Sequence, residues 1–475
     1  MPRRVDLGQV VKSYDVRGRV PDELGPAEVS ALARAFAEQV DALVDARAAL
    51  VVGRDMRTSS PVLSAAVIAG VNAAGVDVVD IGLASTDLVY YASGHLDLPA
   101  VMVTASHNPA GWNGLKLCRQ GARPVGGDSG LGQVRARAEE LLSGARQSPA
   151  LAGPGRIAHR DLLADYGAHL RRLAPVSGRR LRVVVDAANA MAGHTVPAVL
   201  GPLAIDLVPL YFELDGTFPH HVADPLDPIN LVDLQAAVRQ HRADVGLAFD
   251  GDADRCFVVD ERGEPVSGSA VTALIAARAL AGEPGGRVVH NLICSRAVPE
   301  VVRAHGGIPV RTRVGHAVIK AEMARTGAVV GGEHSGHFYF RDFWYADSGM
   351  LAALHVLAAV AEGERPLSEL LVGLLAGSAH YVASGELNDR VPDPRSVLAA
   401  VRAHYEQVAG VSIDGLDGLT VSHPSWWFNL RASHTEPLLR LNVEGLDADT
   451  MATARDDVAA VVRNAQEAGT RADRR

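Results

Sequence analysis

A serine, a histidine and a lysine lie close together in one polar segment of the chain. An apolar run over residues 100–103 predicts a buried strand, and Ser106, His107 and, further on, Lys116 follow it. Because a proline and glycines between them oppose regular structure, Ser106 is expected on an exposed loop. A hydroxyl, a neighbouring imidazole and a cation are the parts of an activated nucleophile. The segment therefore predicts covalent chemistry at Ser106.

Three aspartates alternate after another predicted strand, in the stretch Asp-Gly-Asp-Ala-Asp-Arg that begins at Asp250. The carboxylates of Asp250, Asp252 and Asp254 can converge on one hard cation, and without a cation each pair would repel by roughly a kcal/mol or more. A calcium-binding loop is the alternative, because Glu261 stands where such a loop ends. Arg255, however, replaces the glycine that its turn needs. Mg²⁺ fits better, since three carboxylates leave room for a phosphate oxygen.

Two other loops carry arginines that could face an anion. Near the N-terminus, Tyr14 and Arg17 belong to the segment Tyr-Asp-Val-Arg-Gly, where a short strand runs into a turn. Towards the C-terminus, Arg431, Ser433 and Thr435 lie on a predicted turn between two strands. A guanidinium fork, hydroxyls and backbone N–H groups are typical phosphate ligands. The C-terminal turn is therefore a candidate phosphate site.

Two glycine-led segments carry further polar side chains. His316 and Lys320 are four positions apart on a predicted helix, so they share a face, and spacing alone favours a surface pair. Glu333 and Ser335 lie in the stretch Gly-Glu-His-Ser-Gly-His, which ends at His337. A carboxylate accepts hydrogen bonds and a serine both donates and accepts them, so this stretch suits the recognition of hydroxyl groups.

Length and composition limit the kind of protein. A chain of 475 residues is expected to form roughly three or four domains. Although 48% of its residues are hydrophobic, no run approaches the ~20 residues that span a bilayer, and the N-terminus lacks a signal-peptide core. Three scattered cysteines favour a reduced, cytoplasmic protein. A net charge of −9 argues against nucleic acid as a partner. We expect neither a nucleic-acid nor a membrane partner.

Strands and helices alternate with short connections through most of the chain. Apolar runs beginning at Leu50, Val183 and Val288 are each followed by a helical pattern, which predicts mostly parallel α/β sheets. A segment rich in Ser, Pro and Gly at residues 144–155 is typical of a linker. The last part differs, because several strands precede one long helix over residues 448–467, so it predicts an α+β domain.

These motifs, in their order along the chain, resemble those of the α-D-phosphohexomutases. The resemblance spans the whole sequence and is carried by six segments: the opening motif 14–18, the phosphoserine loop 104–116, the metal loop 250–255, the ligand-facing loop 315–320, the sugar-specificity loop 331–337 and the phosphate-binding loop 431–437. It implies three similar mixed α/β domains and a C-terminal α+β domain. We place these domains at residues 1–150, 151–256, 257–372 and 373–475.

The resemblance also implies roles for individual residues. The catalytic set is Ser106, His107, Lys116, Arg17 and Arg255. The substrate-binding set is Tyr14, His316, Lys320, Glu333, Ser335, His337, Arg431, Ser433, His434, Thr435 and Arg440, with His434 at a position where glycine or asparagine is more usual. Mg²⁺ would be held by Ser106, Asp250, Asp252 and Asp254. His107 and Arg17 compete for the task of handling the hydroxyl proton.

The implied activity is that of an isomerase that moves a phosphoryl group within a sugar. Mannose 6-phosphate and mannose 1-phosphate would interconvert through a phosphoserine and a hexose 1,6-bisphosphate, which also serves as activator. His334 is typical of the phosphomannomutase and dual-specificity branches, whereas phosphoglucosamine mutases typically carry glutamine there. Glucose phosphates are therefore alternative substrates. A sugar phosphatase and a sugar-phosphate-binding regulator are the other classes, and the chain is expected to be a monomer or a homodimer.

Overall fold

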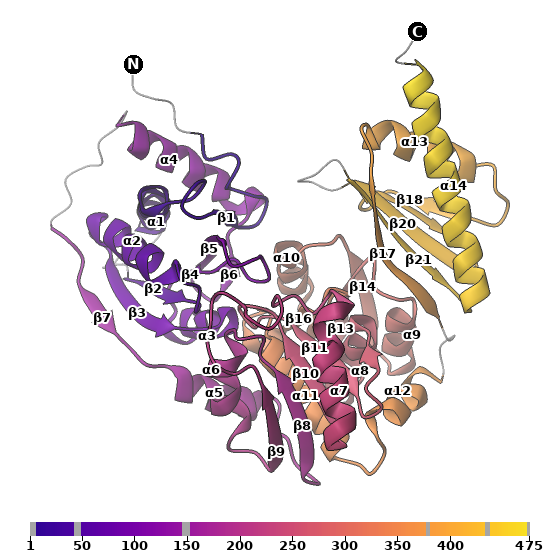
Figure 1. The fold of residues 1–475 in the computed structure, drawn as a ribbon, viewed down its shortest axis with the longest axis horizontal. Helices are drawn as coiled ribbons and strands as arrows, with labels where there is room; N and C mark the ends of the chain where they lie inside the picture. The colour runs from indigo at the N-terminus through magenta and orange to yellow at the C-terminus, as the bar shows by residue number, and fades with distance from the viewer. Residues whose placement is uncertain (1–5, 42–48, 145–152, 377–380, 433–437, 473–475) are drawn as a thin grey trace.

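A computed structural model of the chain describes residues 6–41, 49–144, 153–376, 381–432 and 438–472. The described residues form four β-sheets, each with its own helices, and we call these the first to fourth units. The units follow one another along an arc, so that the first and the fourth face each other across the centre (Figure 1).

The first unit is a seven-stranded sheet in the order β1-β5-β4-β2-β3-β7, with β6 beside β5. Its strands are β1 (Val16–Arg19), β2 (Ala49–Arg54), β3 (Asp77–Leu83), β4 (Ala100–Val103), β5 (Trp112–Arg119), β6 (Arg123–Pro124) and β7 (Ile157–His159). Its helices are α1 (Pro26–Asp41), α2 (Ser60–Ala73), α3 (Thr86–Leu96), the short η1 (Gly127–Ser129) and α4 (Leu131–Ser143). Pro61 in the first turn of α2 helps to start that helix, because its fixed φ suits the position.

The second unit has the strand order β12-β11-β10-β8-β9. Valines dominate its interior strand β8, as expected of a strand buried on both faces. Its strands are β8 (Leu181–Asp186), β9 (Ile205–Leu210), β10 (Val245–Phe249), β11 (Cys256–Asp260) and β12 (Pro265–Val266). Its helices are α5 (Leu163–Leu173), α6 (Ala192–Leu200), the short η2 (Pro228–Leu231) and α7 (Val232–His241).

The third unit has the strand order β14-β13-β15-β16. Its strands are β13 (Arg287–Asn291), β14 (Ile308–Thr312), β15 (Val330–Gly332) and β16 (Phe338–Phe340). Its helices are α8 (Gly268–Gly282), α9 (Ala297–Ala304), α10 (His316–Thr326), the short η3 (Arg341–Phe343), α11 (Gly349–Ala361) and α12 (Leu367–Leu375). Helix α11 is apolar on nearly all sides because it packs against both the third and the second unit.

The fourth unit is an antiparallel sheet in the order β17-β21-β20-β19-β18, which confirms the predicted α+β character. Its strands are β17 (Val382–Arg390), β18 (Ser412–Asp414), β19 (Leu419–Ser422), β20 (Trp426–Ala432) and β21 (Leu438–Gly445), and its helices are α13 (Pro394–Tyr405) and α14 (Ala448–Ala472). Its core, which includes Val401, Phe428 and Val458, is separate from the core that joins the other three units.

The three α/β units repeat one pattern. In each, two neighbouring strands run parallel (β2 and β4, β8 and β10, β13 and β15), and the next strand returns antiparallel (β5, β11 and β16). The loop before the returning strand therefore lies at the carboxyl end of a parallel strand, where ligand sites of α/β sheets form. Those three loops hold Ser106, Asp250–Asp254 and Glu333–His337. This confirms the prediction of three similar units.

The chain leaves the first sheet, and later the second sheet, at positions beyond the first two predicted domain boundaries. Strand β7 follows residue 150 but pairs with β3 of the first sheet. Strands β11 and β12 begin at or after residue 256 but belong to the second sheet. The sequence of a strand does not show whether that strand pairs with the sheet before it or with the sheet after it. The exact domain limits stay a prediction.

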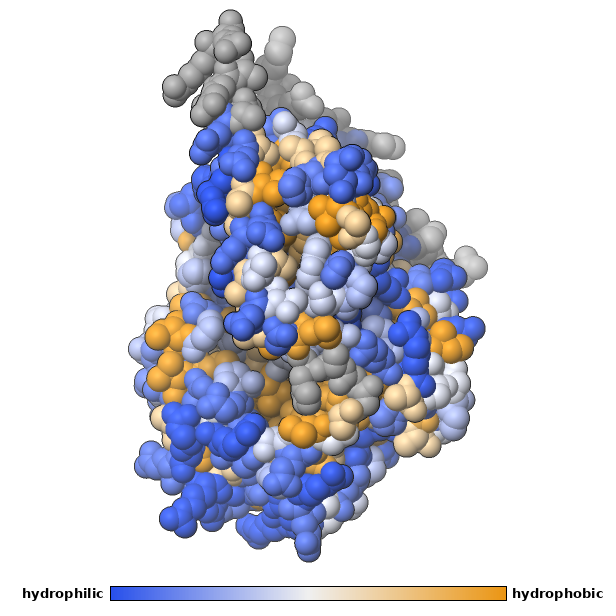
Figure 2. Space-filling view, turned by 90° about the vertical axis from the view of Figure 1, so that its right-hand side faces the viewer, coloured by the Kyte–Doolittle hydropathy of each residue, from blue (hydrophilic) through white to orange (hydrophobic). Residues whose placement is uncertain are grey.

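Hydrophilic side chains cover much of the face shown in Figure 2, and the apolar ones on it form small separate groups. Within the described residues, no helix has the length and apolar content that crossing a membrane requires.

Candidate active site

One buried arginine, Arg57, binds the backbone of the loop that carries Ser106, which we call the serine loop. Arg57 donates hydrogen bonds to the carbonyl oxygens of Ser106 at 2.7 Å, Asn108 at 2.6 Å, Pro109 at 2.8 Å and Trp112 at 3.0 Å. Ser106 itself has φ 51°, in the left-handed region that non-glycine residues seldom adopt. Such a conformation persists only where the surroundings impose it, which is what these four hydrogen bonds do.

The predicted exposure of Ser106 is wrong, because its residue is only 2% exposed. It is covered by the aspartate loop of residues 250–255, which we call the cation loop: a Cβ placed on Gly251 would lie 2.2 Å from the carbonyl oxygen of Ser106. Glycine at position 251 therefore allows the two loops to approach. Sequence reasoning treated each loop alone and could not see that one buries the other.

We predict that Arg57→Ala lowers the free energy of unfolding by about 3–5 kcal/mol, because it leaves the buried carboxylate of Asp55 without its cation and four carbonyl oxygens of the serine loop without their donor. Arg57 and Asp55 form an ion pair of 3.2 Å, and both side chains are fully buried. Urea unfolding followed by circular dichroism measures the change. Arg156→Ala is the control, since the Arg156 side chain is 74% exposed and its ion pair should contribute about 1 kcal/mol or less. Equal losses in the two variants would contradict the bracing role.

The hydroxyl of Ser106 lies between a carboxylate and a guanidinium. Its Oγ donates to Asp250 Oδ2 at 2.7 Å and accepts from Arg255 Nη2 at 3.3 Å. His107 Nδ1 lies 3.4 Å from the same oxygen and also contacts Arg255 Nη2. Burial, with the positive charges of Arg255 and Arg17, holds the pKa of His107 well below its usual value. His107 is thus held as a neutral imidazole.

The three predicted carboxylates converge, as the sequence indicated. Oxygens of Asp250, Asp252 and Asp254 all lie within 4.8 Å of one another, and the three residues are buried. Oδ1 of Asp252 and Oδ1 of Asp254 are buried and have no hydrogen-bond partner in the part of the chain that the structure describes. Unpartnered carboxylate oxygens in this arrangement fit a hard divalent cation.

The charged groups around these carboxylates also favour a bound cation. Lys116 Nζ lies 2.5 Å from Asp252 Oδ2 and 2.5 Å from Asp254 Oδ2. Burial opposes the charge of Lys116, but the two carboxylates outweigh it and raise the pKa of the ammonium. Burial also raises the pKa of Asp250 to about 7, against the attraction of Arg255. Lys116 and Arg255 thus offset two of the three buried carboxylates, and one negative charge remains to attract a divalent cation.

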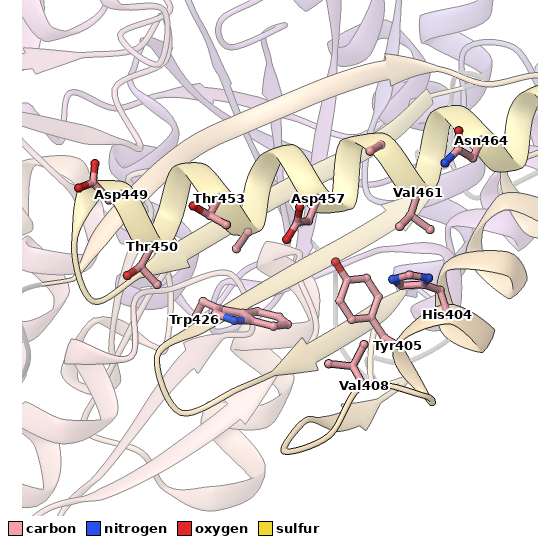
Figure 3. A pocket seen from close by; sticks show the side chains of 12 residues that line it. His404, Tyr405, Val408, Trp426, Asp449, Thr450, Thr453, Asp457, Val461 and Asn464 are labelled. Carbon is pink, nitrogen blue, oxygen red and sulfur yellow. The ribbon is translucent and has the colours of Figure 1, made fainter.

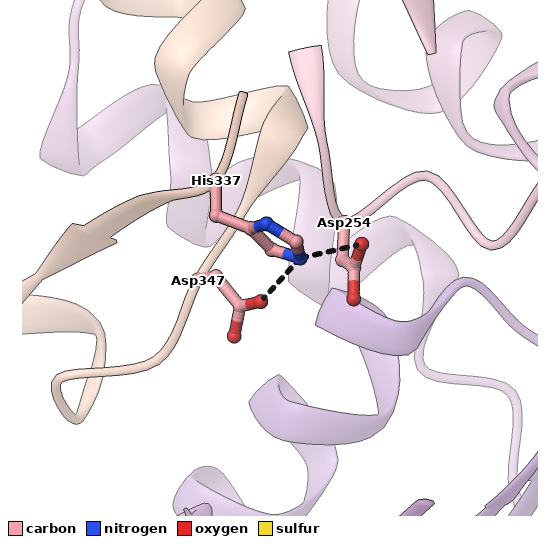
Figure 4. A group of neighbouring side chains, drawn as sticks. All are labelled: Asp254, His337 and Asp347. Atoms are coloured by element: carbon pink, nitrogen blue, oxygen red, sulfur yellow. Dashed lines mark ion pairs between the residues drawn. The ribbon is translucent and has the colours of Figure 1, made fainter. Parts of the chain in front are cut away.

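A second cluster connects the cation loop to the third unit (Figure 4). His337 Nε2 lies 3.6 Å from Asp254 Oδ1 and 3.7 Å from Asp347 Oδ2. Lys320 Nζ lies 2.5 Å from the other oxygen of Asp347, so that carboxylate already has a cation beside it. The cluster therefore joins the loops of two units, and it does not favour a second metal.

The functional loops of all four units meet around one cavity of about 740 Å³. Many of the predicted site residues line it: Tyr14, Arg17, Ser106, His107, Lys116, Asp254, Arg255, His316, His337, Arg431 and Arg440. A separate groove of about 690 Å³ lies in the fourth unit beside α14, with Trp426 and Tyr405 along it (Figure 3). Of the described residues, none lines both.

The two arginines of the fourth unit stand side by side. Arg431 on β20 and Arg440 on β21 are direct cross-strand partners, and both pair with Glu386, at 3.2 Å and 3.0 Å. Two guanidinium groups held together by one carboxylate are a suitable place for a phosphate. Ser433, His434 and Thr435 lie outside the described residues, so their predicted role stays a prediction.

Three other predicted substrate ligands do not line this cavity in the described part of the chain. Glu333 is 2% exposed and accepts from Asn291 Nδ2 at 2.9 Å and from the Tyr339 hydroxyl. Ser335 Oγ lies 3.3 Å from His337 Nδ1, and Lys320 is buried beside Asp347. Among the described residues that line the cavity, Glu333, Ser335 and Lys320 are not found. Their assignment as sugar ligands stays a prediction.

Fold and site together define a class of enzyme that transfers phosphoryl groups. Four family descriptions match in order: phosphoglucomutase/phosphomannomutase alpha/beta/alpha domain I over residues 8–140, domain II over 164–263, domain III over 267–376 and the C-terminal domain over 386–461. The chain belongs to the phosphoglucomutase/phosphomannomutase family of the α-D-phosphohexomutases. The recognition of this family from sequence is confirmed.

Similar proteins extend over almost the whole chain. A protein named "Phosphohexose mutases" from Xanthomonas campestris pv. campestris is 40% identical over 456 residues, which are 95% of this chain and 98% of that protein. A phosphomannomutase of Salmonella montevideo is 39% identical over 91% of this chain and 94% of its own. A solved phosphoglucomutase/phosphomannomutase family protein from Burkholderia thailandensis has a TM-score of 0.87 and 32% identity, and covers 97% of this chain and 98% of its own.

Proposed function

We propose that this chain interconverts mannose 6-phosphate and mannose 1-phosphate through phosphorylated Ser106 and a hexose 1,6-bisphosphate. The observation that carries this proposal is the single cavity that has Ser106 among its lining residues and also Arg431 and Arg440 from another unit. A ligand with a phosphate at each end needs both places, and it needs them in either orientation. The similarity to several phosphomannomutases supports mannose as the sugar.

In the proposed reaction, the bond between phosphorus and Ser106 Oγ breaks while a bond from phosphorus to the free sugar hydroxyl forms. After the bisphosphate has reoriented in the cavity, the bond between its other phosphorus and the sugar oxygen breaks while a bond from that phosphorus to Ser106 Oγ forms. The proton of the serine hydroxyl passes to the sugar oxygen that is released. Arg255 and Lys116 face the charge that develops on the phosphoryl oxygens. Mg²⁺, held by Asp250, Asp252 and Asp254, would neutralise that charge further.

We propose His107 as the group that takes and returns the hydroxyl proton. His107 Nδ1 lies 3.4 Å from Ser106 Oγ, and its environment keeps the imidazole neutral. Arg17, the competing candidate, is held in its charged form: burial opposes that charge, but Asp15 and Asp252 raise the pKa of its guanidinium. A permanently charged Arg17 is better suited to holding a phosphate than to accepting a proton.

The decisive experiment is a coupled assay with mannose 1-phosphate and glucose 1-phosphate side by side, with a trace of the hexose bisphosphate. The proposal expects turnover of the mannose phosphate, and comparable turnover of both sugars would support the dual-specificity alternative. Release of inorganic phosphate in excess of isomerised sugar would favour a phosphatase. Binding of both sugar phosphates with turnover of neither would favour a regulator.

Arg431→Ala should raise KM for the sugar phosphate and lower kcat while Ser106 stays phosphorylated. Loss of a charge-assisted hydrogen bond costs about 1.5–3 kcal/mol, so kcat/KM should fall roughly tenfold to a hundredfold. Steady-state kinetics and intact mass measure the two effects. Arg402→Ala is the control, because Arg402 lies on α13 and its side chain is 44% exposed. If Arg431→Ala loses the phosphoryl group yet binds hexose phosphate normally, another residue holds the distal phosphate.

A further inference from the structure

The start of helix α3 in the first unit lies against the cation loop of the second unit. Thr86, the first residue of α3, is fully buried. Its hydroxyl donates to Asp252 Oδ2 at 2.5 Å, and its backbone N–H donates to the carbonyl oxygen of Asp252 at 2.9 Å. One residue of the first unit thus holds both the side chain and the backbone of Asp252.

These contacts leave the two carboxylate oxygens of Asp252 in different states. Oδ2 accepts from Thr86 and from Lys116 Nζ, each at 2.5 Å. Oδ1 is buried and has no hydrogen-bond partner among the described residues. Two fixed donors on Oδ2 restrict the rotation of the carboxylate. Oδ1 is then left available to a cation.

We propose that Thr86 is a positioning residue, which orients Asp252 so that its Oδ1 is presented to the divalent cation. The inference rests on the proposed cation site and adds to it a residue from outside the aspartate loop. Thr86 is buried and is not among the described residues that line the cavity, so it acts through Asp252.

Thr86 is itself fixed by its two neighbours. Ser85 caps α3, because its Oγ accepts from the backbone N–H of Leu88 at 3.3 Å. Asp87 is fully buried and its Oδ2 accepts from Tyr166 Oη at 2.7 Å and from Ser348 Oγ at 2.6 Å. Tyr166 belongs to the second unit and Ser348 to the third, so the start of α3 is anchored in all three α/β units.

Removal of the Thr86 hydroxyl tests the proposal. In Thr86→Val the side chain keeps its shape, but Asp252 Oδ2 loses one of its two donors. We expect Mg²⁺ to bind about tenfold to a hundredfold more weakly, as for the loss of a hydrogen bond to a charged group, and Thr86→Ser to restore most of the affinity. Isothermal titration calorimetry of the full chain with MgCl₂ alone measures this without any turnover.

Ser93→Ala is the matched control. Ser93 lies on the same helix and is equally buried, but its hydroxyl donates to the carbonyl oxygens of Leu98 at 2.6 Å and Arg119 at 3.2 Å within the first unit. We expect this variant to bind Mg²⁺ as the parent does, even if it is less stable. If Thr86→Val does not fold, Thr86→Ala removes the same hydroxyl with less volume.

Parental Mg²⁺ affinity in a folded Thr86→Val or Thr86→Ala protein would overturn the positioning role, as would an equal loss in Ser93→Ala. Failure of the proposed function looks different. In that case, the parent protein itself would bind no Mg²⁺ or would turn over no hexose phosphate.

Discussion

Ser106→Ala abolishes turnover and removes the one phosphoryl group that we expect on the protein as isolated. Ser106 Oγ lies between Asp250 and Arg255 and faces the cavity that Arg431 and Arg440 also line. Without this oxygen no phosphoenzyme can form, and both half-reactions stop. Removal of a covalent nucleophile typically lowers kcat by several orders of magnitude. Intact mass spectrometry and the coupled assay measure the two losses on the same sample.

Ser93→Ala controls for the loss of a buried hydroxyl elsewhere in the first unit, and it should keep both the phosphoryl group and the activity. A Ser106→Ala protein that still carries a phosphoryl group and converts hexose phosphate at the normal rate would contradict the assignment of Ser106 as the nucleophile.

The second large effect is expected from the cation site. Replacement of Asp250, Asp252 or Asp254 by asparagine should cost several kcal/mol of transition-state stabilisation, on the order of a thousandfold in kcat. The reason is that each change removes one of three buried carboxylates that converge within 4.8 Å. Assays after treatment with a chelator, with and without added Mg²⁺, should show the parent losing and regaining its activity.

Asp260→Asn provides the matched control for this series. Asp260 is a buried aspartate at the far end of β11, where it pairs with Arg262 and not with the cation loop. It should retain the Mg²⁺ dependence of the parent. Full activity of the chelated parent enzyme would show that the metal assignment is wrong.

Local sequence signals placed the polar loops correctly at the ends of strands. The apolar run at residues 100–103 is strand β4, and the aspartates at 250, 252 and 254 follow β10 as expected. Both signals depend on hydrophobic runs that end in polar residues, and such patterns are visible in a single chain. The antiparallel return after each loop and the alignment of the loops in three units come from sheet pairing, which the sequence does not encode locally.

The residues that support the site were beyond sequence reasoning. In the sequence, Arg57 looks like an ordinary turn residue and Thr86 like an ordinary first residue of a helix. Their roles depend on contacts with residues far along the chain, Ser106 for Arg57 and Asp252 for Thr86. Glycines flank Glu333 in the sequence, and that pattern does not predict the burial of its carboxylate or the hydrogen bonds that it accepts from Asn291 and Tyr339 on neighbouring strands. Burial and pairing of this kind are decided by tertiary packing, not by residue type.

The most direct test of the account follows a radiolabelled phosphoryl group on Ser106. The labelled protein is mixed with unlabelled mannose 1-phosphate, and the label is followed in the protein, in the sugar phosphates and in inorganic phosphate. We predict that the label leaves Ser106, passes through mannose 1,6-bisphosphate and appears in mannose 6-phosphate, while Ser106 is phosphorylated again by unlabelled phosphate and almost no inorganic phosphate forms. Loss of the label as inorganic phosphate, or its retention on the protein while unlabelled mannose 6-phosphate accumulates, would contradict the account.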